Sequence, residues 1–182
     1  MTTYPPGVKV IDDVITPRYQ EQLEHKLKIA KWRYTDKITY GDNDDNDPNS
    51  GFAWVGYIKE HGNMEPEVEW FFPLLYEAIY KYDKNLRIHD ILRIRGTMFI
   101  KNQNEGAHVP HRDLRQKHTT MVYYVNDSDG PTNIYDSKTF EITHQVEPKK
   151  GRALIFPGTV YHSSSTPKKT AQRLILNYNF IT

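Results

Sequence analysis

The sequence predicts a mainly β (α+β) protein, a sandwich or barrel of strands with helices packed outside it. Two segments with helical spacing of apolar residues stand in the first 85 residues, and six short β-rich runs separated by turn residues follow them. Nothing between the two parts has the composition of a linker. The 182 residues therefore predict one domain, with helical and strand support in residues 1–87 and a barrel core in residues 88–182.

Composition limits the possible partners and locations. The net charge is only +1, from 24 basic and 23 acidic residues, so no nucleic acid or anionic membrane surface is indicated as a partner. The chain has no Cys, which excludes disulfides, thiolate metal sites and Cys nucleophiles. Neither a signal-peptide pattern nor a run of about 20 apolar residues occurs. We expect a soluble cytoplasmic protein, and the sequence carries no signal for its oligomeric state.

The N-terminal half predicts two strands and two helices. Residues 8–15 are rich in β-branched side chains and read as a strand, and Thr16 and Pro17 then form a helix cap and first turn. The first helix is expected to run to about Lys31, with one apolar face formed by Tyr19, Leu23, Leu27 and Ala30. A strand at residues 52–58 and a second helix at residues 65–83 follow.

The segment 41–51 (GDNDDNDPNSG) is an acidic loop with three possible interpretations. It has some features of a calcium loop, but Gly56 stands where the closing bidentate Glu would be required. A solvated surface loop and a flap over an active site are the other two, and all three stay open at this point.

The C-terminal half is expected to be almost entirely strands. Turn residues such as Asp129-Gly130-Pro131 and Pro157-Gly158 separate the β-rich runs. These runs comprise residues 88–101, 119–125, 132–135, 142–146, 153–156 and 174–180.

His111 and Asp113 form the most informative local pattern. In an extended segment, residues two apart point to the same side, so the two side chains can reach one ion. This spacing alone fits a surface turn with a His–Asp hydrogen bond equally well. His162 lies 49 residues further on, far enough for barrel strands to bring it back. Two His and one carboxylate on one face of an ion leave the opposite face open, which suits Fe(II) with a cosubstrate and O2.

Arg173 adds a fourth member to this set. It interrupts an otherwise apolar strand 11 residues after His162, and its guanidinium can hold a carboxylate through two parallel hydrogen bonds. Lys168 or Lys169 could serve instead, although both lie in a predicted turn. A dicarboxylate that chelates iron at one end and binds Arg173 at the other accounts for all four residues.

The flanking residues resemble a known family. His111-Arg112-Asp113, His162 and Arg173 are similar to the HxD…H…R signature of the 2-oxoglutarate/Fe(II)-dependent oxygenases. Tyr123-Tyr124-Val125-Asn126 with Gly130 and Thr132, and the run from Val146 to Phe156, resemble segments of its prolyl-hydroxylase-like branch. YYVNDSDG is similar to small phage and marine-bacterial members. The resemblance covers about residues 90–180 and implies a double-stranded β-helix, a jelly-roll or cupin-like barrel.

The resemblance also implies roles for single residues. His111, Asp113 and His162 match the iron ligands, Arg173 matches the residue that binds 2-oxoglutarate, and Tyr124 matches a tyrosine that often joins it. His108 falls near the substrate side. Two residues on the strand before the motif are further candidates: we expect Asn102 in the cosubstrate pocket and Arg95 on the substrate side.

The implied reaction is hydroxylation of a substrate with 2-oxoglutarate and O2, releasing succinate and CO2, with no catalytic side chain beyond the metal centre. The substrate could be a protein side chain such as proline, or a small molecule. Pro131 replaces a second glycine of the family pattern, which bears on the substrate class. Two alternatives remain: a non-catalytic cupin-like module that binds a metal or dicarboxylate, and an interaction protein that has lost turnover. Cupins usually carry a Glu, where this chain has Asp113.

Overall fold

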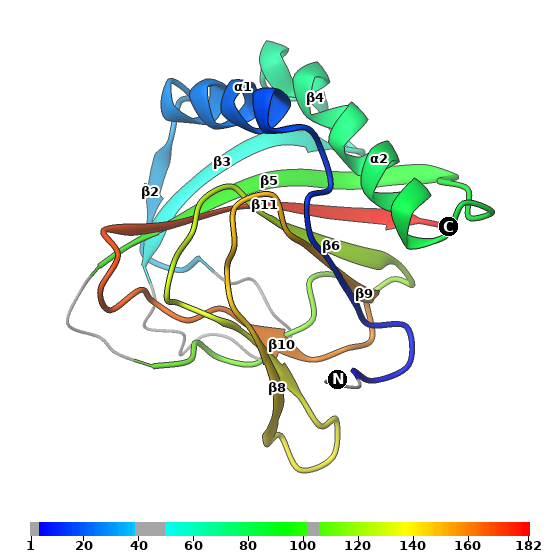
Figure 1. Cartoon of the computed structure of the whole chain (residues 1–182), viewed down its shortest axis with the longest axis vertical. Coiled ribbons are helices and arrows are strands. Elements are labelled where there is room, and N and C mark those ends of the chain that lie inside the picture. The colour runs from blue at the N-terminus through cyan, green and yellow to red at the C-terminus, as the bar shows by residue number, and fades with distance from the viewer. Residues whose placement is uncertain (1–3, 39–49, 102–105) are drawn as a thin grey trace.

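The computed structural model of the protein describes residues 4–38, 50–101 and 106–182. Within them, a large antiparallel sheet carries two helices on one face and faces a small antiparallel sheet on the other (Figure 1). The large sheet runs, in spatial order, β1 (Lys9–Ile11), β9 (Ala153–Pro157), β6 (Thr119–Tyr124), β11 (Gln172–Ile181), β5 (Asp90–Ile100), β3 (Gly51–Ile58) and β2 (Arg33–Thr35), with β4 (Gly62–Asn63) paired to β3. The small sheet runs β10 (His162–Ser163), β7 (Thr132–Tyr135) and β8 (Ile142–Val146).

The strand sequences alternate between two environments, and this alternation forms the cavity. On β11, Leu174, Leu176, Tyr178 and Phe180 pack toward the helices in the main core. Residues of the other parity, including Arg173, Ile175 and Asn177, line a cavity between the sheets. The result confirms the predicted mainly β fold, a double-stranded β-helix with its helices outside the barrel.

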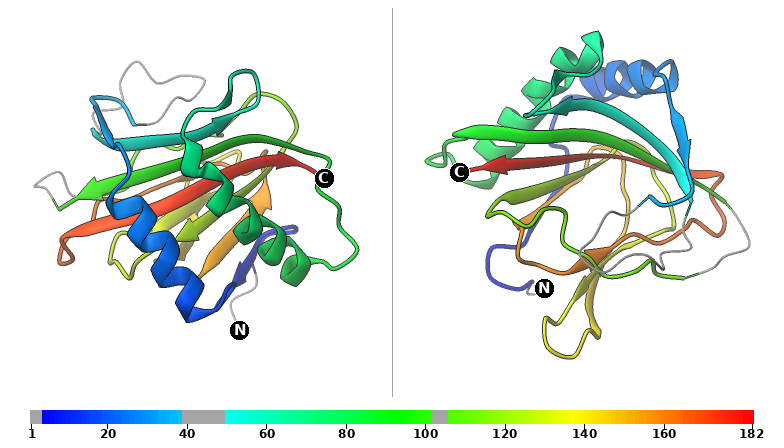
Figure 2. Two further views of the ribbon diagram at one scale, coloured as in Figure 1. Left: turned by 90° about the horizontal axis from the view of Figure 1, so that it is seen from above. Right: turned by 180° about the vertical axis from the view of Figure 1, so that it is seen from behind.

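The first helix, α1 (Pro17–Lys28), begins as the sequence predicts. The Thr16 side chain accepts a hydrogen bond from the backbone N–H of Tyr19, and Pro17 occupies the first turn. Leu23 and Leu27 are fully buried against the sheet. Figure 2 shows from above that both helices lie across the strands of the large sheet. Helical and barrel side chains share one hydrophobic core.

The second helix differs from the prediction of one helix over residues 65–83. A 3-10 helix, η1 (Pro66–Phe71), precedes the α-helix α2 (Phe72–Tyr82). Pro73 has no backbone N–H to donate to a carbonyl one turn earlier, so an α-helical ladder cannot continue through it. The predicted opening strand is also shorter, because Asp13 adopts a left-handed φ of 51° that ends the extended run.

Three short strands had no signal in the sequence. β2, β4 and β10 have three, two and two residues, too few for an alternation of apolar and polar side chains to show. The acidic loop 41–51 lies mostly outside the described residues. None of the described helices is long and apolar enough to cross a membrane.

Candidate active site

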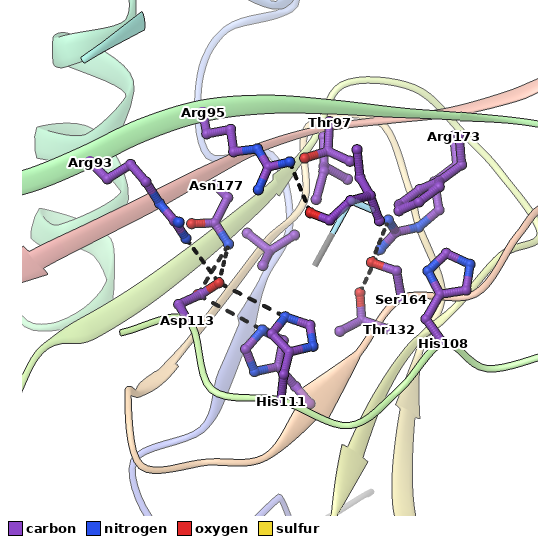
Figure 3. Close-up of a pocket in the computed structure, with 15 residues that line it drawn as sticks. Arg93, Arg95, Thr97, His108, His111, Asp113, Thr132, Ser164, Arg173 and Asn177 are labelled. Carbon is purple, nitrogen blue, oxygen red and sulfur yellow. Dashed lines mark hydrogen bonds and ion pairs between the residues drawn. The ribbon is translucent and has the colours of Figure 1, made fainter. Parts of the chain in front are cut away.

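The candidate active site lies in the cavity between the two sheets, and Figure 3 shows its side chains. Strands β5, β6 and β11 supply one wall, and the segments around His111 and His162 supply the opposite one. His111 and Asp113 lie at one end of the cavity, while Arg173 lies at the other end, beside Thr132 and Ser164 (Figure 3). His162 is next to His111 and Asp113.

His111 and His162 are held side by side by their own backbones. The N–H of His111 donates to the carbonyl of His162 over 2.9 Å, and the N–H of His162 donates back over 3.0 Å. This reciprocal antiparallel bridge places the two ring centroids 4.6 Å apart. The relative position of the two imidazoles is therefore fixed by main-chain hydrogen bonds.

Both imidazoles direct the same ring nitrogen into the site. Nδ1 of His111 lies 3.1 Å from the carbonyl of Val109, and Nδ1 of His162 lies 3.2 Å from the carbonyl of Val160. A carbonyl only accepts, so Nδ1 must carry the hydrogen and Nε2 keeps its lone pair. Each Nε2 faces Asp113, at 4.0 Å from Oδ1 for His111 and 3.8 Å from Oδ2 for His162.

Four side chains hold the carboxylate of Asp113. Thr120 Oγ1 and Asn179 Nδ2 donate to Oδ2 over 3.0 and 2.9 Å, Asn177 Nδ2 lies 3.2 Å from the same atom, and Arg93 Nη2 donates to Oδ1 over 3.1 Å. Burial alone would raise the pKa of Asp113, but electrostatic interactions with His162, Arg93 and His111 and the Asn179 hydrogen bond lower it far below the ordinary value. Asp113 is therefore an anion.

The protonation states suit a metal cation. Burial lowers the pKa of His162, more strongly than the nearby Asp113 raises it, so its imidazole is neutral at neutral pH. Asp binds metals as the carboxylate anion and His binds them as the neutral imidazole. Their ligand atoms all lie within 4.8 Å of one another, and this is the one such His/Asp/Glu group among the described residues. A set of two His and one carboxylate fits Fe(II) with positions left for other ligands.

Arg173 is a buried cation that keeps two N–H donors for an anion in the cavity. Only 1% of it is exposed, and its guanidinium lies between the rings of Phe99 and Tyr124, at 5.9 and 5.7 Å from their centroids. Nε donates to the carbonyl of Gly130, Nη1 to Ser164 Oγ and Nη2 to Thr132 Oγ1. A guanidinium has five N–H donors, so two remain, one on each terminal nitrogen. This pair matches a carboxylate that binds through both oxygens.

Thr132 connects Tyr124 to this anion site. The Tyr124 hydroxyl donates to Thr132 Oγ1 over 2.7 Å, and Arg173 Nη2 donates to the same oxygen over 2.8 Å. Because Thr132 Oγ1 accepts from both, its own hydrogen is available for an acceptor in the cavity that Thr132 lines. The structure places Tyr124 behind Thr132, in the second hydrophobic cluster, rather than on the cavity wall.

The remaining candidates occupy different places. His108 is buried at the Arg173 end of the cavity, where its Nε2 lies 2.9 Å from Thr166 Oγ1 and its ring packs edge-on against Phe99 (Figure 3). Arg95 lines the cavity and donates to the carbonyl of Ile38 over 2.9 Å. Asn102 lies outside the described residues.

The sequence analysis missed the residues that hold these groups in place. Arg93, Thr120, Asn177 and Asn179 bind Asp113, and Thr132 and Ser164 bind Arg173. One signal was present: Arg173, Asn177 and Asn179 are polar residues of one parity on an otherwise apolar strand. Such a pattern indicates that this face of β11 lines a polar interior rather than a hydrophobic core.

Fold and site together describe a barrel whose cavity has a group that could hold a metal ion at one end and a buried guanidinium at the other. Residues 97–181, which carry every candidate ligand, match the model of the 2OG-Fe(II) oxygenase superfamily. The part of the chain that carries the candidate site is thus similar to the 2OG-Fe(II) oxygenase superfamily. No curated protein is significantly similar in sequence.

Solved structures share the fold at low sequence identity. An oxidoreductase of the 2OG-Fe(II) oxygenase family from Burkholderia pseudomallei has a TM-score of 0.75 at 12% identity, over 96% of this chain and 84% of that chain. A Pseudomonas putida prolyl-4-hydroxylase has a TM-score of 0.64 at 14% identity, over 96% and 91%. The epimerase SnoN, in complex with Fe3+, alpha ketoglutarate and nogalamycin RO, has a TM-score of 0.63 at 11% identity, over 96% and 78%.

Proposed function

We propose that the protein is an Fe(II)- and 2-oxoglutarate-dependent oxygenase that hydroxylates a C–H bond of its substrate. One molecule of O2 supplies one oxygen atom to the substrate hydroxyl and one to succinate, and 2-oxoglutarate loses CO2. The observation that carries the proposal is the pairing of two sites in one cavity: two imidazoles and an ionised carboxylate at one end, and a buried guanidinium with two free donors at the other.

Each residue of the cavity then has a defined task. His111, Asp113 and His162 would hold the iron, which supplies the redox chemistry with O2 when bound. Arg173 would bind the distal carboxylate of 2-oxoglutarate through its two remaining N–H groups, and Thr132 would donate a third hydrogen bond. Val122 and Ile175 contribute apolar side chains to the cavity wall. The protein thus contributes the positions of the ligands rather than an acid or base.

The substrate class and a cytoplasmic location are further parts of this proposal. The prolyl-4-hydroxylase among the structural neighbours supports a protein side chain such as proline, and the epimerase complex supports a small molecule. Both neighbours share only the fold with this chain.

An anaerobic binding measurement, made without turnover, distinguishes an oxygenase from a cupin-like binding module. Under anaerobic conditions, Fe(II) and 2-oxoglutarate together should give a weak visible charge-transfer band with the wild type. His111→Ala and Asp113→Ala should lose the band and the release of succinate, whereas His89→Ala, at an exposed histidine, should keep both. A wild type without the band, or succinate release at the wild-type rate in either ligand variant, would overturn the proposal.

A further inference from the structure

A second hollow adjoins the active-site cavity and opens toward the edge of the large sheet. It has a volume of about 480 Å³ and lies over strands β2 and β3, and its walls include Arg93 and Arg95, which also line the active-site cavity. We call it the edge groove. Because the two hollows share these residues, a molecule in the edge groove lies next to the candidate metal site.

Strand register explains the composition of the groove. Ala53, Val55 and Ile58 of β3 pair with Thr97, Arg95 and Arg93 of β5, and cross-strand partners point to the same face of a sheet. The three apolar side chains therefore continue the inner surface of the barrel away from Asp113. On the far side, Arg33 of β2 pairs with Ala53 and lies on the same face.

The groove has an uneven charge. Its lining contains four cations and one acid, Glu65. At the inner end Arg93 is paired with Asp113 over 3.1 Å. At the outer end Lys31 and Arg33 are exposed, and neither side chain has a hydrogen bond or ion pair within the described ranges 4–38, 50–101 and 106–182. Two neighbouring cations with no ion-pair partner in the described part of the chain attract an anion and raise its local concentration.

We propose that the edge groove binds the substrate, and that the substrate is a small molecule with a carboxylate or phosphate at one end and an apolar body. Lys31 and Arg33 hold the anionic end, Ala53, Val55 and Ile58 contact the body, and the carbon to be oxidised passes Arg93 toward the metal site. The volume favours a small molecule, because sites of about 300–1,000 Å³ enclose ligands of that size. This inference rests on the proposed oxygenase function.

A defined pair of probes tests the charge preference. We would add 4-phenylbutyrate or 4-phenylbutan-1-ol, which share one apolar body, to protein loaded with Mn(II) and 2-oxoglutarate. Line broadening of the probe protons by the paramagnetic ion reports binding near the metal site. The wild type should bind the acid and bind the alcohol at least tenfold more weakly. Equal affinity for acid and alcohol, or no broadening by the bound acid, would overturn the inference.

Charge reversal locates the binding site. In the double variant Lys31→Glu/Arg33→Glu, affinity for phenylbutyrate should fall at least tenfold, because two attractive charges become repulsive. The matched control Arg18→Glu/Lys84→Glu makes the same change in net charge at exposed residues outside the groove. The control should bind as the wild type does, and both double variants should keep wild-type affinity for 2-oxoglutarate. Unchanged phenylbutyrate binding in the groove variant would contradict the assignment.

Fractionation of a cell extract tests the substrate class directly. Extract that passes a 1 kDa filter is divided on an anion-exchange resin, and each fraction is assayed for stimulation of succinate release. Stimulation should appear in the retained small-molecule fraction and fall at least tenfold in Lys31→Glu/Arg33→Glu. Loss after phosphatase treatment identifies a phosphate, and persistence identifies a carboxylate. Stimulation confined to the neutral or the protein fraction would overturn the inference.

The two proposals fail in different ways. A wild type that gives no charge-transfer band with Fe(II) and 2-oxoglutarate removes the oxygenase proposal. A wild type with a normal band, but with phenylbutyrate binding indifferent to Lys31 and Arg33, removes only the anionic-substrate inference.

Discussion

Thr120 on β6 donates its hydroxyl hydrogen to Oδ2 of Asp113 over 3.0 Å. The same threonine oxygen accepts a hydrogen bond from Asn179 Nδ2 over 3.1 Å, and Asn179 also donates to Oδ2. Thr120 and Asn179 are both fully buried. This closed triangle fixes the rotation of the carboxylate, so that Asp113 is oriented before any metal arrives.

Removal of the threonine hydroxyl should weaken iron binding. Thr120→Val keeps the shape of the side chain but leaves Oδ2 with fewer donors, and loss of a hydrogen bond that orients a metal ligand typically costs about 10–100-fold in affinity. Anaerobic titration with Fe(II) measures the change. Thr119→Val, at the half-buried neighbour on the same strand, is the control and should bind Fe(II) like the wild type. Wild-type affinity in Thr120→Val would show that Asp113 does not need this support.

Replacement of Arg173 by Lys should affect 2-oxoglutarate selectively. A lysine keeps the positive charge but loses the planar fork, and the loss of one or two charge-assisted hydrogen bonds of about 1.5–3 kcal/mol corresponds to roughly a 10–100-fold higher KM. The rate at saturating 2-oxoglutarate should change much less. Lys169→Ala tests the alternative anchor and should leave KM unchanged. A rise in KM for the Lys169 variant, with none for Arg173→Lys, would reassign the anchor.

Thr132 should contribute more than Tyr124 to the binding of 2-oxoglutarate. Thr132→Val removes the hydroxyl that faces the cavity, and we expect KM for 2-oxoglutarate to rise about tenfold, the equivalent of about 1.4 kcal/mol. Tyr124→Phe removes only a hydrogen bond behind Thr132, so a rise of about two- to fivefold is expected. Steady-state kinetics at varied 2-oxoglutarate separates the two variants. A larger effect for Tyr124→Phe would mean that the tyrosine hydroxyl itself reaches the cosubstrate.

Asp129 should make stability depend on pH, because its carboxylate fixes the loop that leads to β11. It accepts hydrogen bonds from the backbone N–H groups of Lys168, Lys169 and Thr170 and from the Thr170 hydroxyl. Burial alone would raise the pKa of Asp129, but these hydrogen bonds lower it well below the ordinary value of 3.8. A lowered pKa means that this stabilisation is present above about pH 4 and is lost as the pH falls through the pKa of the folded state.

The corresponding variant is Asp129→Asn. At pH 7 it should unfold about 2–4 °C below the wild type, for a loss of about 1 kcal/mol once solvent screening at this half-buried group is allowed for. The difference should shrink as the pH falls below 4. Asp36→Asn, at an exposed carboxylate, is the control. Thermal unfolding followed by circular dichroism between pH 2.5 and 7 provides the measurement, and a constant difference across that range would contradict the prediction.

Most strands could be predicted because their side chains alternate over four or more residues. The predicted bounds of residues 132–135 and 142–146 coincide with β7 and β8. The short strands β2, β4 and β10 could not be predicted, since they depend on the register of longer neighbours. The strand order of the large sheet brings β5, β6 and β11 together. Only this order places the residues that support Asp113 and the side chain of Arg173 around one cavity. That order depends on long-range packing, which local sequence patterns do not encode.

The reciprocal backbone bridge between His111 and His162 affects how the protein loses and rebinds a metal ion. Because main-chain atoms hold the two segments together, departure of the ion leaves the imidazoles adjacent. Capture of a new ion then requires no rearrangement of the chain, and iron-depleted protein should remain folded and regain activity on simple replenishment. The main chain thus keeps the two imidazoles in position after one ion leaves and before another binds.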